Sequence, residues 1–450
     1  MDRRTYEDLV ELDQAHWVHP LNHPATQEQP ILYERGEGIY LFGSDGKRYI
    51  DGLSGLWNAA VGHGRAELAD AAAEQMRKVG FNSNYAGYSN EPAIRLAAKL
   101  ADLAYDNMSG VFLANTGSDT NETNFKAARF YWEFNGKPDK NKIISRSWGY
   151  HGTTLGAMSA TGMTVYWDHF EPRNPEIIAA RRDGPCDSLS CQINGQCNGC
   201  LDAIVETIER VGPDQVAALI TEPVQGAGGV FPPEDDYFPK LREICDRYEI
   251  LLIVDEVITG FGRTGKWFAL DHWGVQPDMM SVSKAITSGY VPFGAAIWSK
   301  QVHETIAQTD PNRKFMHAYT TSGHPVGSAV ALRNLQIIED EKLVENAAER
   351  GAQLLGGLQA LAETPHVGHV RGLGLMCAFE LLQDPESETR FDAALMMGPK
   401  MVEAMKARGL VTRFRNDHIV FAPPLVISEA QVDEMLEIIH ESLKEVTAGL

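Results

Sequence analysis

Short apolar runs alternate with helical patterns through the middle of the chain, from about residue 110 to residue 300. The runs expected to form strands are residues 111–115, 142–146, 217–223, 251–257, 279–284 and 293–298. Helical spacing of apolar residues is found between them, over residues 119–134, 201–211 and 237–248. Buried apolar runs that alternate with helices predict an α/β fold with a mainly parallel sheet.

The two ends of the chain have a different pattern. Residues 31–61 contain short extended runs around an SDGK turn, which predicts a hairpin. After residue 325, helical patterns lie on both sides of a strand-rich stretch at 367–382. We therefore expect a smaller α+β domain beside the large sheet. The predicted boundaries are 69–326 for the large domain, and 1–68 with 327–450 for the small domain.

Composition and charge narrow the possible partners. The chain has 450 residues and a formal net charge of −21, which disfavours binding to nucleic acid or to an anionic membrane. No apolar run approaches the ~20 residues that a membrane span needs. The charged N-terminal sequence lacks the apolar stretch of a signal peptide. We expect a soluble cytoplasmic protein that acts on small molecules.

Polar residues follow the predicted strands, where ligands of parallel sheets bind. The Thr116-Gly117-Ser118 turn precedes a predicted helix, with Gly117 allowing close backbone approach and Ser118 as the expected N-cap. Free N–H groups and the helix dipole at such a turn suit a phosphate, although small-residue turns open many helices. The turn is therefore a candidate phosphate site that needs support from its neighbours.

Two other strand ends carry residues that suit a charged aromatic ring. Asp255 and Val257 are two apart on an expected strand and so face the same way, which fits a flat heteroaromatic cation. Lys284 ends an apolar strand, and a desolvated lysine can form a Schiff base with an aldehyde. With Tyr150 as an aromatic stacking residue, this set predicts pyridoxal phosphate as the cofactor.

Long motifs make the chain similar to a known family. The segments NTGSDTNE, TEPVQGAGGV, LLIVDEVITGFGRTG, SKAITSGYVPFGA and TTSGHPVG begin at residues 115, 221, 251, 283 and 320. They resemble the class III (ω-type) aminotransferases of pyridoxal-phosphate fold type I. The Leu56-Trp57 pair and the YHG sequence at 150–152 resemble the branch that uses amines or ω-amino acids with pyruvate.

The resemblance implies a reaction and a set of cofactor contacts. An amino group would move from an amine or ω-amino acid to a keto acid, with pyruvate expected, in two half-reactions. Lys284 would be the Schiff-base lysine and proton shuttle, and Asp255 the partner of the ring nitrogen. The other residues that match cofactor contacts are Gly117, Ser118, Tyr150, His151, Glu222, Val257 and Thr320.

The resemblance also implies a homodimer and a substrate pocket. Thr320 matches a threonine that reaches the phosphate of the neighbouring subunit, so shared active sites are expected, in a dimer or a dimer of dimers. Leu56 and Trp57 match pocket walls. Arg413 matches the family's mobile arginine for a substrate carboxylate. Arg415 lies two residues further on and offers the same bidentate fork, so either arginine could bind the carboxylate.

Three alternatives remain open at this point. Residues 260–265 read GFGRTG, a G-x-G-x-x-G pattern after a strand, which would suit a nicotinamide-dependent oxidoreductase. A decarboxylase or aminomutase of the same fold would share the cofactor residues. A reduced surface loop, a metal site or a redox role is open for four cysteines, although we expect no metal at the active site. These cysteines are Cys186, Cys191, Cys197 and Cys200.

Overall fold

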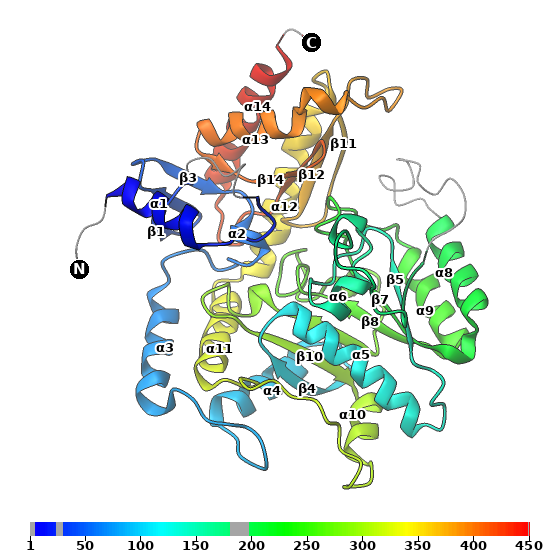
Figure 1. Ribbon diagram of the computed structural model, residues 1–450. Coiled ribbons are helices and arrows are strands. Elements are labelled where there is room, and N and C mark those ends of the chain that lie inside the picture. The colour runs from blue at the N-terminus through cyan, green and yellow to red at the C-terminus, as the bar shows by residue number, and fades with distance from the viewer. Residues whose placement is uncertain (1–4, 24–29, 181–197, 449) are drawn as a thin grey trace.

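The computed structural model describes residues 5–23, 30–180, 198–448 and 450 (Figure 1). A large sheet with its helices forms the lower part of the view, and α12, α13 and α14 lie with smaller sheets in the upper part. No helix within the described ranges is long and apolar enough to cross a membrane.

The large sheet has seven strands in the order β4-β10-β9-β8-β7-β5-β6. They are β4 (Met108–Ala114), β5 (Lys142–Arg146), β6 (Ile177–Ala180), β7 (Val216–Thr221), β8 (Leu251–Asp255), β9 (Met279–Val282) and β10 (Gly294–Ser299). The five strands from β9 to β6 are parallel, whereas β10 is antiparallel to both β4 and β9. The predicted mainly parallel sheet is confirmed.

Helices cover both faces of this sheet, which explains the continuous apolar runs. All residues of β7, β8, β9 and β10 are buried, as expected of strands covered on both sides. The covering helices include α5 (Gly117–Phe134), α6 (Leu155–Ala160), α8 (Asn198–Val211), α9 (Tyr237–Arg247) and α10 (Lys300–Ala307). The carboxyl ends of the parallel strands therefore open beside the N-terminus of α5.

Segments from the two ends of the chain share one sheet. Its order is β1 (Tyr33–Glu37), β2 (Tyr40–Gly43), β3 (Arg48–Asp51) and β13 (Leu410–Val411). The antiparallel pair β2 and β3 forms the predicted hairpin around the SDGK turn. Strand β13 lies parallel to β3, with Leu410 opposite Ile50. The predicted two-segment small domain is compatible with this pairing, and its boundaries stay a prediction.

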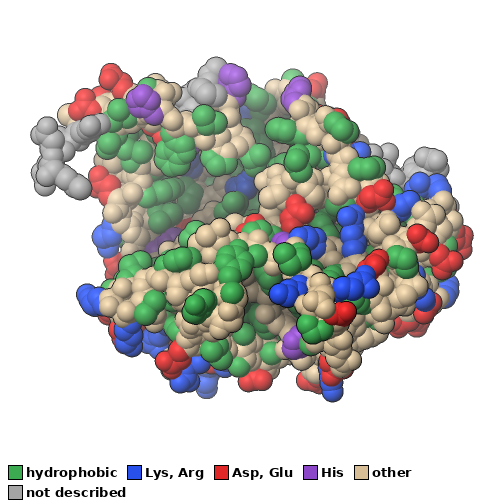
Figure 2. Space-filling model, turned by 60° about the horizontal axis from the view of Figure 1, so that its bottom comes forward, with side chains coloured by type: hydrophobic (Ala, Val, Ile, Leu, Met, Phe, Trp, Pro, Cys, Tyr) green, Lys and Arg blue, Asp and Glu red, His purple; other side chains and the backbone are tan. Residues whose placement is uncertain are grey.

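A second small sheet carries the C-terminal candidates. Its order is β11 (Val367–Gly372), β12 (Cys377–Leu381), β15 (His418–Phe421) and β14 (Arg413–Arg415). Helices α12 (Leu343–Leu361), α13 (Met397–Ala407) and α14 (Glu429–Thr447) pack with it (Figure 1). Helices α3 (Ala66–Val79), α4 (Glu91–Leu103) and α11 (Pro325–Asp340) form a further layer. Figure 2 shows a hollow between two rims of the molecule, with hydrophobic side chains on its walls.

The GFGRTG motif has a packing role and lacks the helix that a dinucleotide site needs. Residues 257–268 form consecutive turns and bends, and only a short 3-10 helix at Ala269–His272 follows. A Cβ atom on Gly265 would lie 2.9 Å from the Cβ of Ala348 in α12. The buried Arg263 guanidinium donates to Leu375 O at 3.1 Å and to Ser54 Oγ at 3.0 Å. The motif thus joins the large sheet to the upper part of the molecule.

Candidate functional site

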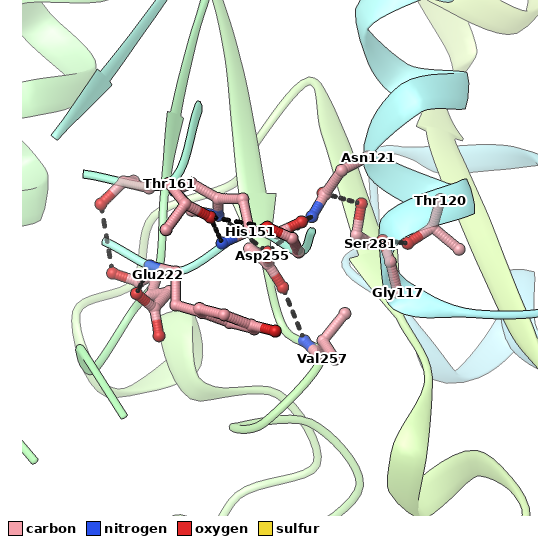
Figure 3. A network of polar contacts seen from close by, with 12 residues as sticks. Gly117, Thr120, Asn121, His151, Thr161, Glu222, Asp255, Val257 and Ser281 are labelled. Carbon is pink, nitrogen blue, oxygen red and sulfur yellow. Dashed lines mark hydrogen bonds and ion pairs between the residues drawn. The ribbon is translucent and has the colours of Figure 1, made fainter. Parts of the chain in front are cut away.

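Asp255 is the last residue of β8, and its buried carboxylate accepts three hydrogen bonds (Figure 3). The Val257 N–H donates to Oδ1 at 3.1 Å. Asn121 Nδ2 and His151 Nδ1 each lie 2.8 Å from Oδ2. Donors from three separate segments fix the orientation of this buried carboxylate.

Asn121 was not singled out from the sequence, yet it organises this group. Its Nδ2 donates to Asp255 and also to the backbone oxygen of His151 at 2.8 Å. Ser281 on β9 donates through Oγ to Asn121 Oδ1 at 2.7 Å. The available signal was its spacing of four residues from Gly117, which places both on one face of α5. That face meets the strand ends.

His151 connects Asp255 to the loop that follows β5. Its backbone N–H donates to Thr161 Oγ1 at 2.9 Å. With Nδ1 bound to Asp255, the ring Nε2 is buried and has no hydrogen-bond partner. A buried polar atom without a partner is costly in a protein interior. The ring therefore presents an unused hydrogen-bonding atom inside the site.

The N-terminus of α5 differs in one detail from the prediction. The helix begins at Gly117, and its N-cap is Thr116, whose hydroxyl accepts from the Asp119 N–H at 3.1 Å. Ser118 was expected as the cap, but it lies inside the first turn. Its hydroxyl accepts from Thr153 N at 3.4 Å. Ser118 is thus beside the N-terminal N–H groups rather than bonded to them.

The sequence predicted that Val257 and Asp255 face the same way on one strand, and this prediction is wrong. Strand β8 ends at Asp255, and the chain turns there so that the Val257 N–H bonds back to the carboxylate. The Val257 side chain nevertheless reaches the site, because a Cβ atom on Gly117 would lie 3.0 Å from Val257 Cγ1. A Cβ on Gly152 would lie 2.1 Å from Ser118 Oγ. Because Gly117 and Gly152 have no side chain, Val257 and Ser118 can pack closely against the backbone at these two positions.

Lys284 follows β9 with a left-handed backbone, φ 47°, and a partly buried side chain. Burial lowers the pKa of its ammonium group. The charges of Asp255 and Glu222 oppose this effect, and Arg413 adds to it. Lys284 therefore lies within electrostatic reach of both carboxylates and of β14. Its neutral amine is accessible at a lower pH than that of a solvated lysine.

Glu222 and Tyr150 form the wall opposite α5. The Glu222 carboxylate accepts from Tyr150 N at 2.8 Å and from Gly226 N at 3.0 Å. Burial raises the pKa of Glu222 to about 7. Burial also raises the pKa of Tyr150 to about 12, so its phenol stays protonated. The Tyr166 ring packs edge-on against Tyr150 at 5.4 Å.

The residues expected to line the substrate pocket differ in how far they are buried. Trp57 is 4% exposed and belongs to an apolar cluster with Val224 and Ile258, whereas Leu56 is 48% exposed. Arg413 is exposed and lies near enough to Tyr150 and Lys284 to affect their pKa values.

Thr320 lies away from the Asp255 network, and the four cysteines lie wholly or partly outside the described residues. Thr320 is exposed, while its neighbour Thr321 donates to Asn115 Oδ1 at 2.5 Å. Cys186, Cys191 and Cys197 lie outside the described residues, as does the side chain of Cys200. Within the described ranges, no cluster of His, Cys, Asp and Glu is arranged to hold a metal ion.

The donor set fits a phosphorylated, cationic pyridine aldehyde. Asp255 is a buried acceptor for a ring N–H⁺, and Lys284 is an amine for the aldehyde. The free N–H groups at Gly117 and Ser118 fit a phosphate. The unpartnered Nε2 of His151 belongs to the network around Asp255, and the Val257 side chain packs directly against Gly117. These residues therefore fit pyridoxal phosphate.

Comparison with known proteins agrees with this fit. The family model for aminotransferase class-III matches residues 22–443. A diaminobutyrate–2-oxoglutarate transaminase of Halomonas elongata is 38% identical over 99% of this chain and 98% of that protein. A putrescine–pyruvate aminotransferase of Pseudomonas aeruginosa is 37% identical over 93% and 91%. The solved ω-transaminase of Pseudomonas jessenii in complex with PMP is 38% identical, with a TM-score of 0.92 over 97% and 98%.

Proposed function

The chain belongs to the class III aminotransferases, which depend on pyridoxal phosphate, and from this premise we propose that it moves amino groups from amines or ω-amino acids to pyruvate. The predicted resemblance, fold class, cofactor and transaminase activity are confirmed by the comparisons. The observation that carries the residue assignment is the buried Asp255 carboxylate within electrostatic reach of Lys284. The donor, the acceptor and the individual roles below are the proposal.

Each cofactor role follows from the surroundings of the residue. When bound, pyridoxal phosphate supplies an electrophilic carbonyl carbon for amines and a ring that accepts an electron pair. Asp255 would hold the proton on the ring nitrogen, because its carboxylate is buried and oriented by Asn121, His151 and Val257. Gly117 and Ser118 would bind the phosphate, while Val257 and Tyr150 would contact the ring faces.

Lys284 would act as both the covalent anchor and the proton carrier. Its pKa is lowered by burial, so Nζ can lose its proton and attack a carbonyl carbon. Once released, the same amine can take a proton from the substrate carbon and return it elsewhere. His151 would position Asp255, and Glu222 would hold the Tyr150 backbone. Tyr150, with its phenol protonated, would form a neutral wall.

Substrate binding is proposed for the opposite side of the site. Arg413 is an exposed cation near Lys284, which suits the carboxylate of pyruvate or of an ω-amino acid. The putrescine–pyruvate aminotransferase relative supports an amine donor and a pyruvate acceptor. Leu56 and Trp57 would form the apolar walls for the carbon chain of the donor. The cytoplasmic location stays a prediction.

A homodimer with shared sites is part of the proposal. Thr320 is exposed in the single chain, and its loop is held by Asn84, whose Nδ2 donates to Ser322 O at 2.7 Å. Large apolar side chains near this loop are also exposed, with Tyr88 71% exposed and Met316 81% exposed. Exposed apolar patches of this kind often mark protein interfaces. Light scattering should give a mass of two chains or a multiple of it.

The activity is tested by alanine formation from pyruvate against a panel of donors. The panel contains ω-amino acids, diamines, aryl and alkyl amines, and a taurine-like sulfonate. We expect alanine with at least one class and a matching change in the cofactor absorbance when the donor is added alone. An absorbance change without alanine would retain the transaminase and reject pyruvate. No alanine and no absorbance change with any donor would reject the proposed donor classes.

A further inference from the structure

Lys284 begins a tight turn whose backbone is unfavourable. The turn is a short 3-10 helix over Lys284–Ile286 that follows β9. Lys284 has a positive φ of 47°, and Ser288, just after the turn, has a φ of 50°. Residues other than glycine rarely adopt this left-handed conformation, which persists only where surrounding contacts enforce it. The contacts around this turn therefore determine where the Lys284 side chain starts.

Asn334 on α11 supplies contacts of this kind. The residue is buried, and its Nδ2 donates to Ala285 O at 2.8 Å and to Ile286 O at 3.1 Å. Its Oδ1 accepts from Ser288 Oγ at 2.6 Å. Backbone oxygens can only accept hydrogen bonds, so these partners fix which end of the carboxamide faces the turn. Both ends of the carboxamide are thus bonded to the segment that carries Lys284.

Other side chains of the same loop bond within the loop itself. Ser283 Oγ donates to Phe293 O at 2.7 Å, and Thr287 Oγ1 donates to Val291 O at 2.7 Å. All four residues belong to the connection between β9 and β10. These bonds give the loop its shape but do not attach it to another layer of the molecule. The bonds from Asn334 attach it to α11.

Ser288 links Asn334 to a third part of the chain. Its hydroxyl donates to Asn334 and accepts from Val61 N at 3.1 Å. Val61 is buried and lies between β3 and α3. The same segment packs closely on the loop, because a Cβ atom on Gly289 would lie 2.6 Å from Asn58 Nδ2. The turn is therefore held between α11 and this N-terminal segment.

We propose that Asn334 is a positioning residue for transamination, which fixes the Lys284 turn against α11 so that the lysine amine starts from one place relative to Asp255. The inference rests on the proposed transaminase function, in which Lys284 is both anchor and proton carrier. Asn334 acts through the backbone oxygens of the turn. Such indirect contacts matter because a displacement of about 1 Å in a reacting group can lower a rate about a hundredfold.

The test compares Asn334→Leu with wild type, using enzyme loaded with pyridoxal phosphate, one amine donor and pyruvate. Leucine keeps the branched outline of the side chain but has no hydrogen-bonding group. We expect kcat to fall about tenfold, because the turn keeps its internal bonds and loses its attachment to α11. The KM of the donor should change less than about twofold, because the substitution leaves the groups that bind the donor in place.

A spectroscopic titration separates positioning from a loss of stability. Burial lowers the pKa of the Lys284 amine. The charges of Asp255 and Glu222 oppose this effect, and Arg413 adds to it. A looser turn would let water reach the lysine nitrogen and weaken the effect of burial. In Asn334→Leu, the pH midpoint of the cofactor absorbance change should therefore rise by about half a pH unit or more.

The matched control is Asn346→Leu. Asn346 on α12 also donates through Nδ2 to two backbone oxygens, Leu425 O at 2.6 Å and Ile427 O at 3.0 Å. These oxygens belong to the segment before α14 and not to the Lys284 turn. Both asparagine variants should have a lower melting temperature. The control should keep the kcat and the pH midpoint of the wild-type enzyme.

Ser288→Ala decides the question if Asn334→Leu does not fold. It removes the hydroxyl bonded to Asn334 Oδ1 and leaves both bonds made by Nδ2. We expect kcat to fall about threefold, with a rise of the pH midpoint that is smaller than in Asn334→Leu.

Two outcomes would overturn the inference. If the variants of Asn334 and Ser288 that fold have a lower melting temperature but keep the wild-type kcat and pH midpoint, Asn334 is only structural. If Asn346→Leu lowers kcat and moves the midpoint as much as Asn334→Leu does, the effect is a general loosening of the protein. Failure of the proposed function looks different, because the wild-type enzyme would then form no alanine with any donor.

Discussion

The surroundings of Asp255 and those of the β14 arginines are built in opposite ways. Asp255 is buried, and every hydrogen bond that orients it comes from this chain: Val257 N, Asn121 Nδ2 and His151 Nδ1. On β14, Arg413 is exposed, and Arg415 has a buried Nε atom without a partner. Donors of this chain orient the first charge, whereas the second pair of charges has no acidic partner among the residues that the structure describes.

This difference separates what must stay bound from what must exchange. A cofactor kept through many turnovers benefits from groups that are oriented before it arrives, because little reorganisation is then needed. A substrate that enters and leaves in each half-reaction needs charges that are free to receive it. On the proposed assignment, the large sheet would provide the fixed chemistry, and the C-terminal sheet would provide the selectivity. The predictions below test each side of that division, from the largest effect to the smallest.

Lys284→Ala should give the largest effect, because Lys284 is a buried amine on which the charges of both Asp255 and Glu222 act. We expect turnover to fall by at least about a thousandfold, the scale of losing a covalent nucleophile. Some noncovalent cofactor binding should remain, because the Asp255 group is intact. The measurement is alanine formation, together with borohydride reduction and peptide mapping.

The mapped label identifies the anchor directly. In the wild-type enzyme it should lie on Lys284, and in Lys284→Ala it should disappear. Lys300→Ala removes an exposed lysine on α10 and should leave both label and turnover unchanged. A label found on another lysine would contradict the assignment of the fixed side of the site.

Asp255→Asn keeps the shape of the side chain and removes its charge. We expect kcat to fall by about a hundredfold, because the ring nitrogen would lose the anion that keeps it protonated. The matched control is Asp278→Asn. Asp278 accepts from Leu252 N at 2.7 Å at the opposite end of β8, so this change should cost stability more than rate. Equal losses of rate in the two variants would show that Asp255 is only structural.

Asn121→Ala tests whether the orientation of Asp255 matters as well as its charge. The carboxylate would keep two of its three donors, so we expect kcat to fall about tenfold with little change in the KM of the donor. Asn135→Ala, at the other end of α5, should leave kcat unchanged. A lower melting temperature with normal kcat would instead make Asn121 a purely structural residue.

Sequence patterns identified the residues that stand out by type and place. Asp255 and Lys284 are charged residues at the ends of apolar strands, so their position alone suggested chemistry. Asn121 could not be found in this way, because it is a neutral residue inside a helix. Its bond to Asp255 joins residues 134 positions apart. Only the assembled sheet brings α5 and β8 together.

The predicted ends of α5 and β8 were wrong for a different reason. Thr116 and Ser118 lie on either side of Gly117 and have the same capping chemistry, so the choice between them depends on where the helix begins. The end of β8 at Asp255 depends on a turn that uses the carboxylate itself as acceptor. Sequence patterns predict that a strand or helix exists better than they predict its last residue.

Glu222→Gln should have the smallest effect and depend on pH. Burial raises the pKa of Glu222 to about 7, from an ordinary value of 4.5. The folded protein therefore holds this proton over a range where the unfolded chain has released it. Stability from this group is present at low pH and falls as the pH rises from about 4.5 to about 7. The variant lacks that loss, so its melting temperature relative to wild type should rise by about 2–4 °C between pH 5 and pH 8.

The direction of that change distinguishes two descriptions of the wall at Tyr150. A carboxylate accepts from both Tyr150 N and Gly226 N, while a carboxamide has one acceptor oxygen and must place its NH₂ against the other N–H. This cost is the same at every pH. It therefore shifts the melting temperature of the variant by a constant amount and does not change how the difference from wild type depends on pH. Glu403→Gln on the exposed face of α13 controls for the lost charge alone. If the difference in melting temperature between Glu222→Gln and wild type does not change with pH, Glu222 is already ionised in the folded protein. The site would then contain a second buried carboxylate anion beside Asp255.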